Sequence, residues 1–490
     1  PFGRAKLNIS IDASRPVDGH FAGKIESTIN EFDYKGYKYE NITVDGSFSR
    51  NAFDGCLMIN DPNGSLHADG FFSHNGKNSV FNFMAKVKNF HPDKLNLTKK
   101  YEEPDISFSL NADFSGNNID NIEGNIIVDS ITFNTKPSNF FLKQFKVAAS
   151  GHSLDRKLII ESDLLNGEVT GAYSFKTIFP SFMNTFSAYL PALINVSKKN
   201  IKDIKENNFS LLLTVQNTED LSNTLKLPFT VLSPGRITGL YNNQYNRFRL
   251  EAFLPHFKLG KTTFQSGYLD CDNLTDKIEL KLRATSYNEK GRKNYLDLKL
   301  GAKDNVLNTV VNWANNKEKT FKAEISASTL FTEIQEEKKK KSLLTEITLN
   351  PTQMTLNDSV WNISPAFISL KDKRVEVKDI YVYHGMQYAK INGFVSPSPE
   401  DTLNLELNDI ELSNIFDILN IPVLQFAGKA TGKFNINDLY GSRILNTDLI
   451  VKDFSFNKVT LGKLDLFSEW DDKEKGILMQ GSIFKDDSTW

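Results

Sequence analysis

Apolar and polar residues alternate in short segments from one end of the sequence to the other, and a helical period rarely replaces this pattern. Residues 6–13, 209–215, 247–252 and 277–284 are typical, with apolar side chains recurring at every second position. Successive side chains of a strand point to opposite faces, so such segments form a sheet with one apolar and one polar face. The pattern predicts an all-β protein, and the functional question becomes what covers the apolar face.

Turn residues interrupt the alternation at short, regular spacings. Asp61-Pro62-Asn63-Gly64, Asn166-Gly167 and Ser396-Pro397-Ser398-Pro399 are examples. Intervals of about 8 to 14 residues are typical of hairpin-connected strands and too short for βαβ units. We therefore expect a mainly antiparallel meander, although a solenoid with long strands would mix orientations.

Two segments have a helical period. In residues 180–196, apolar side chains recur at steps of three and four, and Pro191 is expected to interrupt the helix. Residues 413–419 form a second short candidate, interpreted as a helical lid over the sheet.

The chain of 490 residues is longer than a single hydrophobic core usually supports, so it must be subdivided or form an elongated repeat. We predict five consecutive segments. These are sheet at 1–176, amphipathic helix and connector at 177–208, sheet at 209–335, a charged loop at 336–341, and sheet at 342–490.

Charge and cysteine content exclude several classes of protein. The 58 basic and 60 acidic residues give a net charge of −2, which argues against a nucleic-acid partner and against a broad anionic-membrane patch. Cys56 and Cys271 are too few for a disulfide framework. They are compatible with a periplasmic protein, and the favoured interpretation is a pair of buried apolar thiols. No apolar run is long enough to span a bilayer, so we interpret the chain as an internal piece whose anchor or export signal lies outside it.

Motifs for catalysis or cofactor binding do not stand out. Residues 428–433 resemble a phosphate loop only superficially, because the spacing fails and Phe434 replaces the hydroxyl residue. The seven histidines are scattered without metal-ligand spacing. We therefore expect no enzyme activity, no cofactor and no metal.

Two hypotheses account for the apolar face. In the first, two sheets close face to face about 10 Å apart and leave a dry protein core. In the second, the sheet curls into a long trough in which acyl chains replace the second apolar wall, each buried methylene contributing about 0.8 kcal/mol. The alternation is the same in both, so it leaves the choice open.

A loose internal repeat and a series of short motifs resemble the TamB family of the AsmA-like superfamily, in its Bacteroidota form. Residues 32–57 share with residues 453–464 an aromatic pair, a tight turn, a strand and a charged turn, as expected of stacked repeats. The motifs at 361–365, 375–380, 390–396, 401–407, 426–432 and 449–454 follow the family's order, and the 34–46 block and the 180–191 helix also fit.

The resemblance implies a bridge-like lipid transport protein that spans the periplasm as a β-taco, a curled, U-shaped sheet with a hydrophobic groove. An N-terminal helix outside this chain would anchor it in the inner membrane. The family is linked to phospholipid transport toward the outer membrane and to outer-membrane protein assembly with a TamA-type barrel, which would bind through parts outside this chain.

Carried onto this sequence, the resemblance places the groove lining on the alternating apolar residues. The predicted lining residues are Leu7, Ile9, Ile11, Ile42, Val44, Phe81, Phe83, Phe209, Leu211, Leu213, Phe248, Leu250, Ile278, Leu280, Leu282, Leu296, Leu298, Leu300, Leu403, Leu405, Leu407, Phe454 and Phe456. Two other functions stay open. One is a chaperone-like scaffold for outer-membrane β-barrels that acts by strand augmentation. The other is a cell-surface β-sandwich array for adhesion or glycan binding.

Overall fold

Nearly all of the described chain is β-strand. The computed structural model describes residues 2–14, 21–76, 78–152, 154–195, 205–287, 293–315, 321–335, 341–413, 426–471, 473–474 and 476–485. Its 31 strands belong to one hydrogen-bonded sheet in which sequence neighbours mostly pair as antiparallel strands. The expected all-β, meander-like fold is confirmed.

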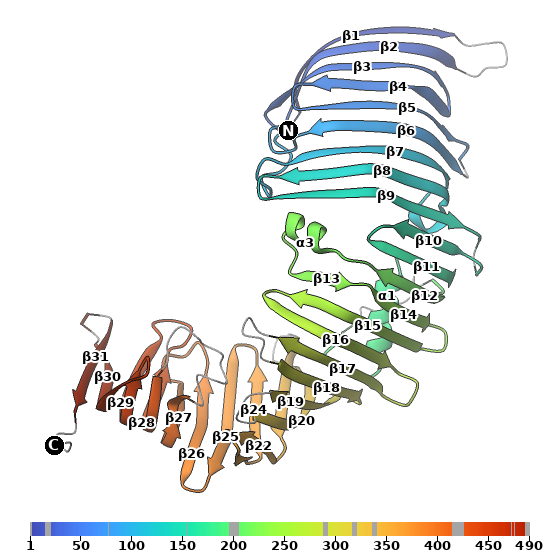
Figure 1. The fold of residues 1–490 in the computed structure, drawn as a ribbon. Coiled ribbons are helices and arrows are strands. Elements are labelled where there is room, and N and C mark those ends of the chain that lie inside the picture. The colour runs from blue at the N-terminus through green and yellow to red at the C-terminus, as the bar shows by residue number, and fades with distance from the viewer. Residues whose placement is uncertain are drawn as a thin grey trace. The chain divides into compact units, whose positions relative to one another are not determined.

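The first of two compact units comprises residues 1–182 and 198–269. Its strands lie side by side largely in chain order, and β1 to β9 are visibly bowed along their length (Figure 1). They are β1 (Phe2–Ser14), β2 (Ala22–Tyr34), β3 (Tyr37–Ser49), β4 (Ala52–Asp61), β5 (Gly64–His74), β6 (Ser79–Phe90), β7 (Asp105–Ser115), β8 (Glu123–Thr135), β9 (Ser138–Ser150), β10 (Lys157–Ser162), β11 (Leu165–Ala172), β12 (Asn208–Val215), β13 (Phe229–Ser233), β14 (Gly235–Asn242), β15 (Arg247–Leu259) and most of β16 (Thr262–Asp272).

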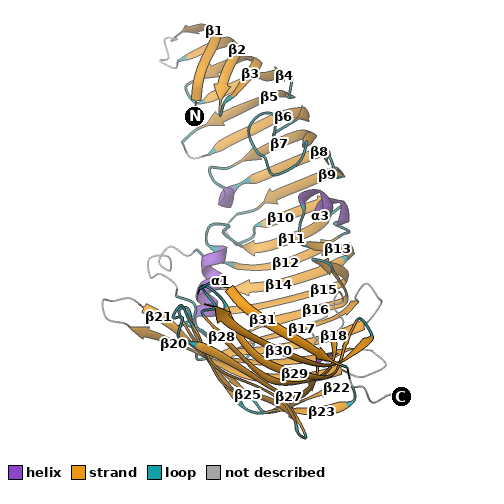
Figure 2. Ribbon diagram, turned by 90° about the vertical axis from the view of Figure 1, so that its left-hand side faces the viewer, coloured by secondary structure: helices purple, strands orange, loops and turns teal. Residues whose placement is uncertain are grey.

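The second unit comprises residues 183–197 and 270–490. Its strands also curve along their length, most clearly β25 to β31 (Figure 2). They are β17 (Ile278–Tyr287), β18 (Lys293–Lys303), β19 (Val306–Asn315), β20 (Phe321–Gln335), β21 (Lys341–Leu349), β22 (Thr352–Leu356), β23 (Ser359–Ile363), β24 (Ala366–Lys371), β25 (Arg374–His384), β26 (Gln387–Val395), β27 (Thr402–Glu411), β28 (Phe426–Asn437), β29 (Ile444–Phe456), β30 (Val459–Asp471) and β31 (Gly476–Phe484).

Prolines divide several long strands into two shorter ones. Pro234 separates β13 from β14, yet both pair with β15, one with its C-terminal part and the other with its N-terminal part. Pro351 separates β21 from β22, which likewise share β20 as a partner. A proline cannot donate a hydrogen bond to the ladder, so the pairing stops there and resumes beyond it.

β-bulges recur in the long strands at a polar residue in the left-handed conformation. Asn89, Asp379, Asp409 and Asp453 have φ between 48° and 54°. At each of them the bulged strand has one more residue than the neighbouring strand with which it pairs. Asn and Asp tolerate this conformation better than other non-glycine residues.

Two short α-helices interrupt the strands in the part of the chain that the structure describes. Helix α1 (Ile178–Ser187) begins two residues before the predicted 180–196 segment and ends well before Pro191, so the predicted helix was too long at its C-terminal end. The 3-10 helix η1 covers Ile119–Asn121. The second helix, α3 (Glu219–Leu225), was missed, although Thr218 with Glu219 and Asp220 in the first turn is a helix-start pattern. Among the described residues, no helix is both long and apolar enough to cross a bilayer.

Two of the predicted segments lie largely outside the described residues. Of the 413–419 helix candidate, only Ser413 is described. Of the 336–341 charged loop, only Lys341 is described, and it is the first residue of β21.

Candidate functional site

In the first unit, strand register places apolar side chains on one face of the sheet across many strands. Directly paired residues of neighbouring strands share a face. One row of such partners crosses from β1 to β15 without a polar residue. It consists of Ile11, Ile25, Gly46, Gly55, Gly70, Phe83, Ala112, Ile126, Val147, Ile160, Gly167, Leu213, Ile237 and Ala252. We call the face that carries this row the apolar face of the first unit.

The opposite face of these strands is mostly polar. The adjacent row consists of Ser10, Glu26, Asp45, Cys56, Asp69, Met84, Asn111, Ile127, Lys146 and Glu161. In β6 the two faces differ clearly, because Phe81, Phe83 and Ala85 are half-buried while the residues between them are exposed. The alternation read from the sequence is therefore a physical difference between two faces.

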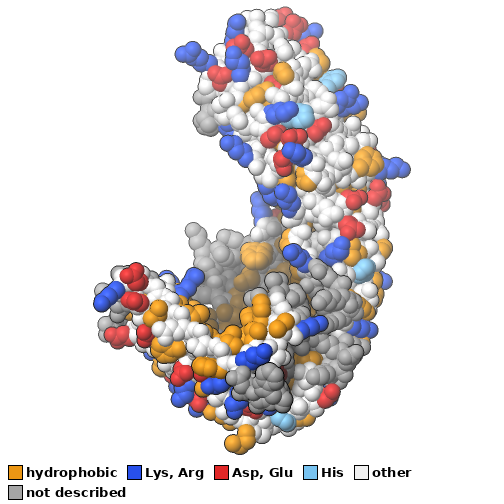
Figure 3. All heavy atoms as spheres, turned by 60° about the vertical axis from the view of Figure 1, so that its left-hand side comes forward, with side chains coloured by type: hydrophobic (Ala, Val, Ile, Leu, Met, Phe, Trp, Pro, Cys, Tyr) orange, Lys and Arg blue, Asp and Glu red, His pale blue; other side chains and the backbone are white. Residues whose placement is uncertain are grey.

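The second unit has an apolar face of the same kind. Its row of paired residues crosses from β17 to β29, and the row contains a single polar side chain, the hydroxyl of Thr329. It consists of Ile278, Ala302, Leu307, Thr329, Ile347, Ile368, Val377, Gly393, Leu403, Ile436 and Leu445. Figure 3 shows hydrophobic side chains gathered in a hollow in the lower part of the view.

All of the predicted lining residues lie on the apolar face of their own unit, and most of them are half-buried. The half-buried residues are Ile42, Val44, Phe81, Phe83, Phe209, Leu211, Leu213, Leu280, Leu282, Leu296, Leu298, Leu300, Leu403 and Leu405. The exposed residues are Leu7, Ile9, Ile11, Leu250 and Phe456, among which Ile11 is the most exposed at 59 %. A large share of this apolar surface thus remains in contact with water.

Four predicted lining residues are instead covered by protein: Phe248, Ile278, Leu407 and Phe454 are each less than 9 % exposed. In the first unit, the ring of Phe182 in the middle of α1 stacks on Tyr241 at 4.1 Å between centroids, and Tyr241 pairs directly with Phe248. The helix therefore covers the apolar face at this point. The side chain of Asn207, which is fully buried, holds the helix by donating to the hydroxyl oxygens of Thr177 and Ser181.

In the second unit, part of the apolar face is closed by a hydrophobic core. Its buried members are Phe321, Leu356, Trp361, Leu407, Ile410, Ala430, Leu449, Val451 and Phe454. They come from β20, β22, β23, β27, β28 and β29, all strands of the same sheet. The apolar face is thus partly a protein core and partly open.

The β-bulges add residues to the apolar face that strict alternation misses. Leu407 and Ile410 lie three positions apart, yet both face the same way because the bulge at Asp409 inserts one residue. Val451 and Phe454 have the same relationship around Asp453. The signal in the sequence is an Asn or Asp, preceded by a polar residue, directly before an Ile or Phe that breaks the alternation.

Glycines on the apolar face allow close contact between neighbouring strands. Gly46 and Gly55 pair directly, and a Cβ atom built on Gly46 would lie 2.9 Å from the Cα of Gly55. A Cβ atom on Gly70, the next residue of the row, would lie 2.2 Å from the Cβ of Phe83. Any larger side chain would push these strands apart.

A polar cavity of about 460 Å³ lies beside η1 in the first unit. It contains the buried guanidinium of Arg156, which lies 4.0 Å from the ring centroid of Tyr173 and donates to the Tyr173 carbonyl oxygen. Burial raises the pKa of the Tyr173 phenol. The interactions of Arg156 are those of a structural cation, and the cavity has no apolar lining comparable to the sheet face.

Comparison with known proteins gives no family assignment. No family model, no curated protein and no solved structure matches this chain.

Proposed function

We propose that this chain is a non-enzymatic lipid-binding protein whose apolar sheet faces hold the acyl chains of phospholipids. The observation that carries the proposal is the uninterrupted apolar row of the first unit, most of whose neighbours on the same face are exposed or half-buried. All 31 strands belong to one sheet, so no separate second sheet pairs with this face among the described residues.

The energetics favour an acyl guest over water. Each methylene that leaves water contributes about 0.8 kcal/mol, so a fatty-acid tail is retained without any specific polar contact. Equivalent apolar positions repeat from strand to strand, so one tail has many sites of similar free energy. A repeated site of this kind suits movement along the sheet, which is the basis for proposing transport as well as binding.

The cellular setting follows from the TamB resemblance and is part of the proposal. In this setting the chain is a periplasmic segment of a longer protein that is anchored in the inner membrane. Phospholipids move along it between the inner and outer membranes, and a TamA-type barrel binds elsewhere in the full-length protein and links it to outer-membrane protein assembly.

The decisive experiment is lipid analysis of the purified chain. We expect phospholipid to co-purify and to be detected by native mass spectrometry and by extraction. A photo-crosslinking residue at Leu298, on the apolar face, should attach to lipid, whereas the same residue at Lys299, on the opposite face, should not. Absence of bound lipid, or equal labelling at both positions, would contradict the proposal. Crosslinks to unfolded barrel proteins without lipid would favour the chaperone-like scaffold.

A further inference from the structure

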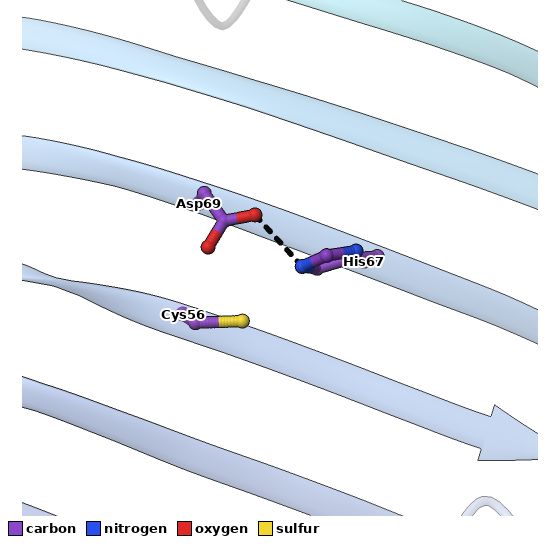
Figure 4. Close-up of side chains that lie close together, drawn as sticks. All are labelled: Cys56, His67 and Asp69. Atoms are coloured by element: carbon purple, nitrogen blue, oxygen red, sulfur yellow. Dashed lines mark ion pairs between the residues drawn. The ribbon is translucent and has the colours of Figure 1, made fainter.

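Three potential metal ligands meet on the polar face of the first unit. Cys56 on β4 and Asp69 on β5 are direct cross-strand partners, and His67 lies two residues before Asp69 on the same face. One ligand atom from each residue lies within 4.8 Å of the other two. Figure 4 shows the three side chains converging, with His67 Nε2 2.7 Å from an Asp69 carboxylate oxygen. It is the one such group of three among the residues that the structure describes.

The turn between β4 and β5 determines this arrangement. Asp61 pairs with Gly64 across the two-residue turn Pro62-Asn63, and an Asp61 carboxylate oxygen accepts a hydrogen bond from the backbone N–H of Asn63 at 2.8 Å. The phenol of Tyr37 donates a second hydrogen bond to the same carboxylate. A fixed turn fixes the register of its hairpin, and here that register sets Cys56 opposite Asp69.

The surroundings of the three residues attract a cation. Glu26, Asp45, Cys56 and Asp69 follow one another across four neighbouring strands. Directly opposed like charges such as Glu26 and Asp45 are unfavourable in a sheet. The nearest opposing charge on β6 is Lys86, the cross-strand partner of His67. A divalent cation beside Cys56 would offset the repulsion between the carboxylates.

From this geometry we infer that Cys56, His67 and Asp69 form a binding site for a transition-metal ion, and that the class of ion is Zn²⁺. Thiolate, imidazole and carboxylate are the ligands that zinc takes, with bonds of about 2.0–2.3 Å. A tetrahedral ion with such bonds holds its ligand atoms about 3–4 Å apart, so small rotamer changes of exposed side chains suffice. Water would occupy the fourth position.

Metal binding at this site requires a proton to leave Cys56. The metal ion displaces this proton and separates the Asp69 carboxylate from His67.

The test is titration of the reduced, metal-free chain with Co²⁺ and then Zn²⁺. We expect one Co²⁺ ion per chain with a sulfur-to-cobalt charge-transfer band, and displacement of this ion by Zn²⁺. Cys56→Ser should abolish the band, while His67→Gln and Asp69→Asn should weaken binding by about tenfold or more. Cys271→Ser is the matched control, since Cys271 is the other cysteine and is buried in the second unit.

Two outcomes would overturn the inference. One is no stoichiometric binding of either metal; the other is a charge-transfer band that persists in Cys56→Ser or disappears in Cys271→Ser. Circular dichroism of each variant checks that the fold is intact, which we expect because His67 and Asp69 are exposed and Cys56 is half-buried.

Discussion

Leu280 on β17 lies directly opposite Leu300 on β18, and both side chains are half-buried on the apolar face of the second unit. The next residue, Lys281, lies opposite Lys299 on the other face, and both lysines are exposed. Leu280 and Lys281 are adjacent in one strand, yet they lie on opposite faces of the sheet. The same substitution at each position therefore tests the role of each face.

Leu280→Glu is expected to reduce lipid occupancy and leave the fold largely intact. A carboxylate on the apolar face must be desolvated before an acyl chain can cover it. Loss of contact with about two methylenes weakens binding by about tenfold. The measurement is the phospholipid content of the purified variant by mass spectrometry. Lys281→Glu introduces the same side chain on the opposite face and should retain full occupancy; equal losses in both variants would contradict the lipid-binding proposal.

Asp409→Val should destabilise the second unit by about 1–2 kcal/mol, because a β-branched residue is strained at the positive φ of the bulge. The backbone N–H of Asp409 donates to the hydroxyl oxygen of Thr431 at 2.9 Å, which holds the bulge in place. Tryptophan fluorescence during urea unfolding reports on this unit, since all of the tryptophans lie in residues 313–490. Asp409→Gly is the control and should stay within a few tenths of a kcal/mol of the parent protein. A valine variant as stable as the glycine variant would show that the bulge carries no conformational constraint.

Gly70→Ala should loosen β4 to β6. The new Cβ atom would lie 2.2 Å from the Cβ of Phe83, so the strands must separate, at a cost of about 1–3 kcal/mol. Hydrogen–deuterium exchange of these strands measures the effect. Gly239→Ala, also on the apolar face, meets no atom closer than 3.5 Å and should leave exchange unchanged. Unaltered exchange in Gly70→Ala would mean that the close contact can relax freely.

The two cysteines should differ in their rate of alkylation. Burial raises the pKa of the Cys271 thiol to about 11, so about one thiol in a thousand is ionised at pH 8. We expect iodoacetamide to modify half-buried Cys56 at least about tenfold faster than Cys271, as measured by peptide mass spectrometry. Similar rates would show that Cys271 is accessible.

The raised pKa of Cys271 also determines how the free energy of unfolding changes with pH. The unfolded state loses the thiol proton near pH 9, while the folded state keeps it until about pH 11. The contribution of this thiol to stability is therefore complete below pH 9 and is lost as pH rises toward 11. In Cys271→Ala this part of the pH dependence should vanish from urea unfolding curves, and its persistence would assign it to another group.

Local regularity made much of the fold predictable. The alternation in β6 and β17 depends only on the two-residue period of a strand, so the sequence alone assigns the apolar side chains to one face. The turn at Asp61–Gly64 was equally visible, and its register could have placed Cys56 opposite Asp69. The histidines were instead assessed by their spacing along the sequence, which shows no metal-ligand pattern.

The amino-acid sequence by itself determined that this protein is a long antiparallel sheet with two chemically different faces, because strand period and turn residues act over a few neighbours. Only the tertiary structure decided where the apolar face is open and where it is closed. Phe182 reaches Tyr241 from a helix, and Trp361 joins Leu407 and Phe454 in one core. Burial of this kind depends on how the sheet curves and on which distant segments cover it. Period-two alternation is identical in a covered strand and in an open one, so the local sequence cannot distinguish a covered apolar face from an open one.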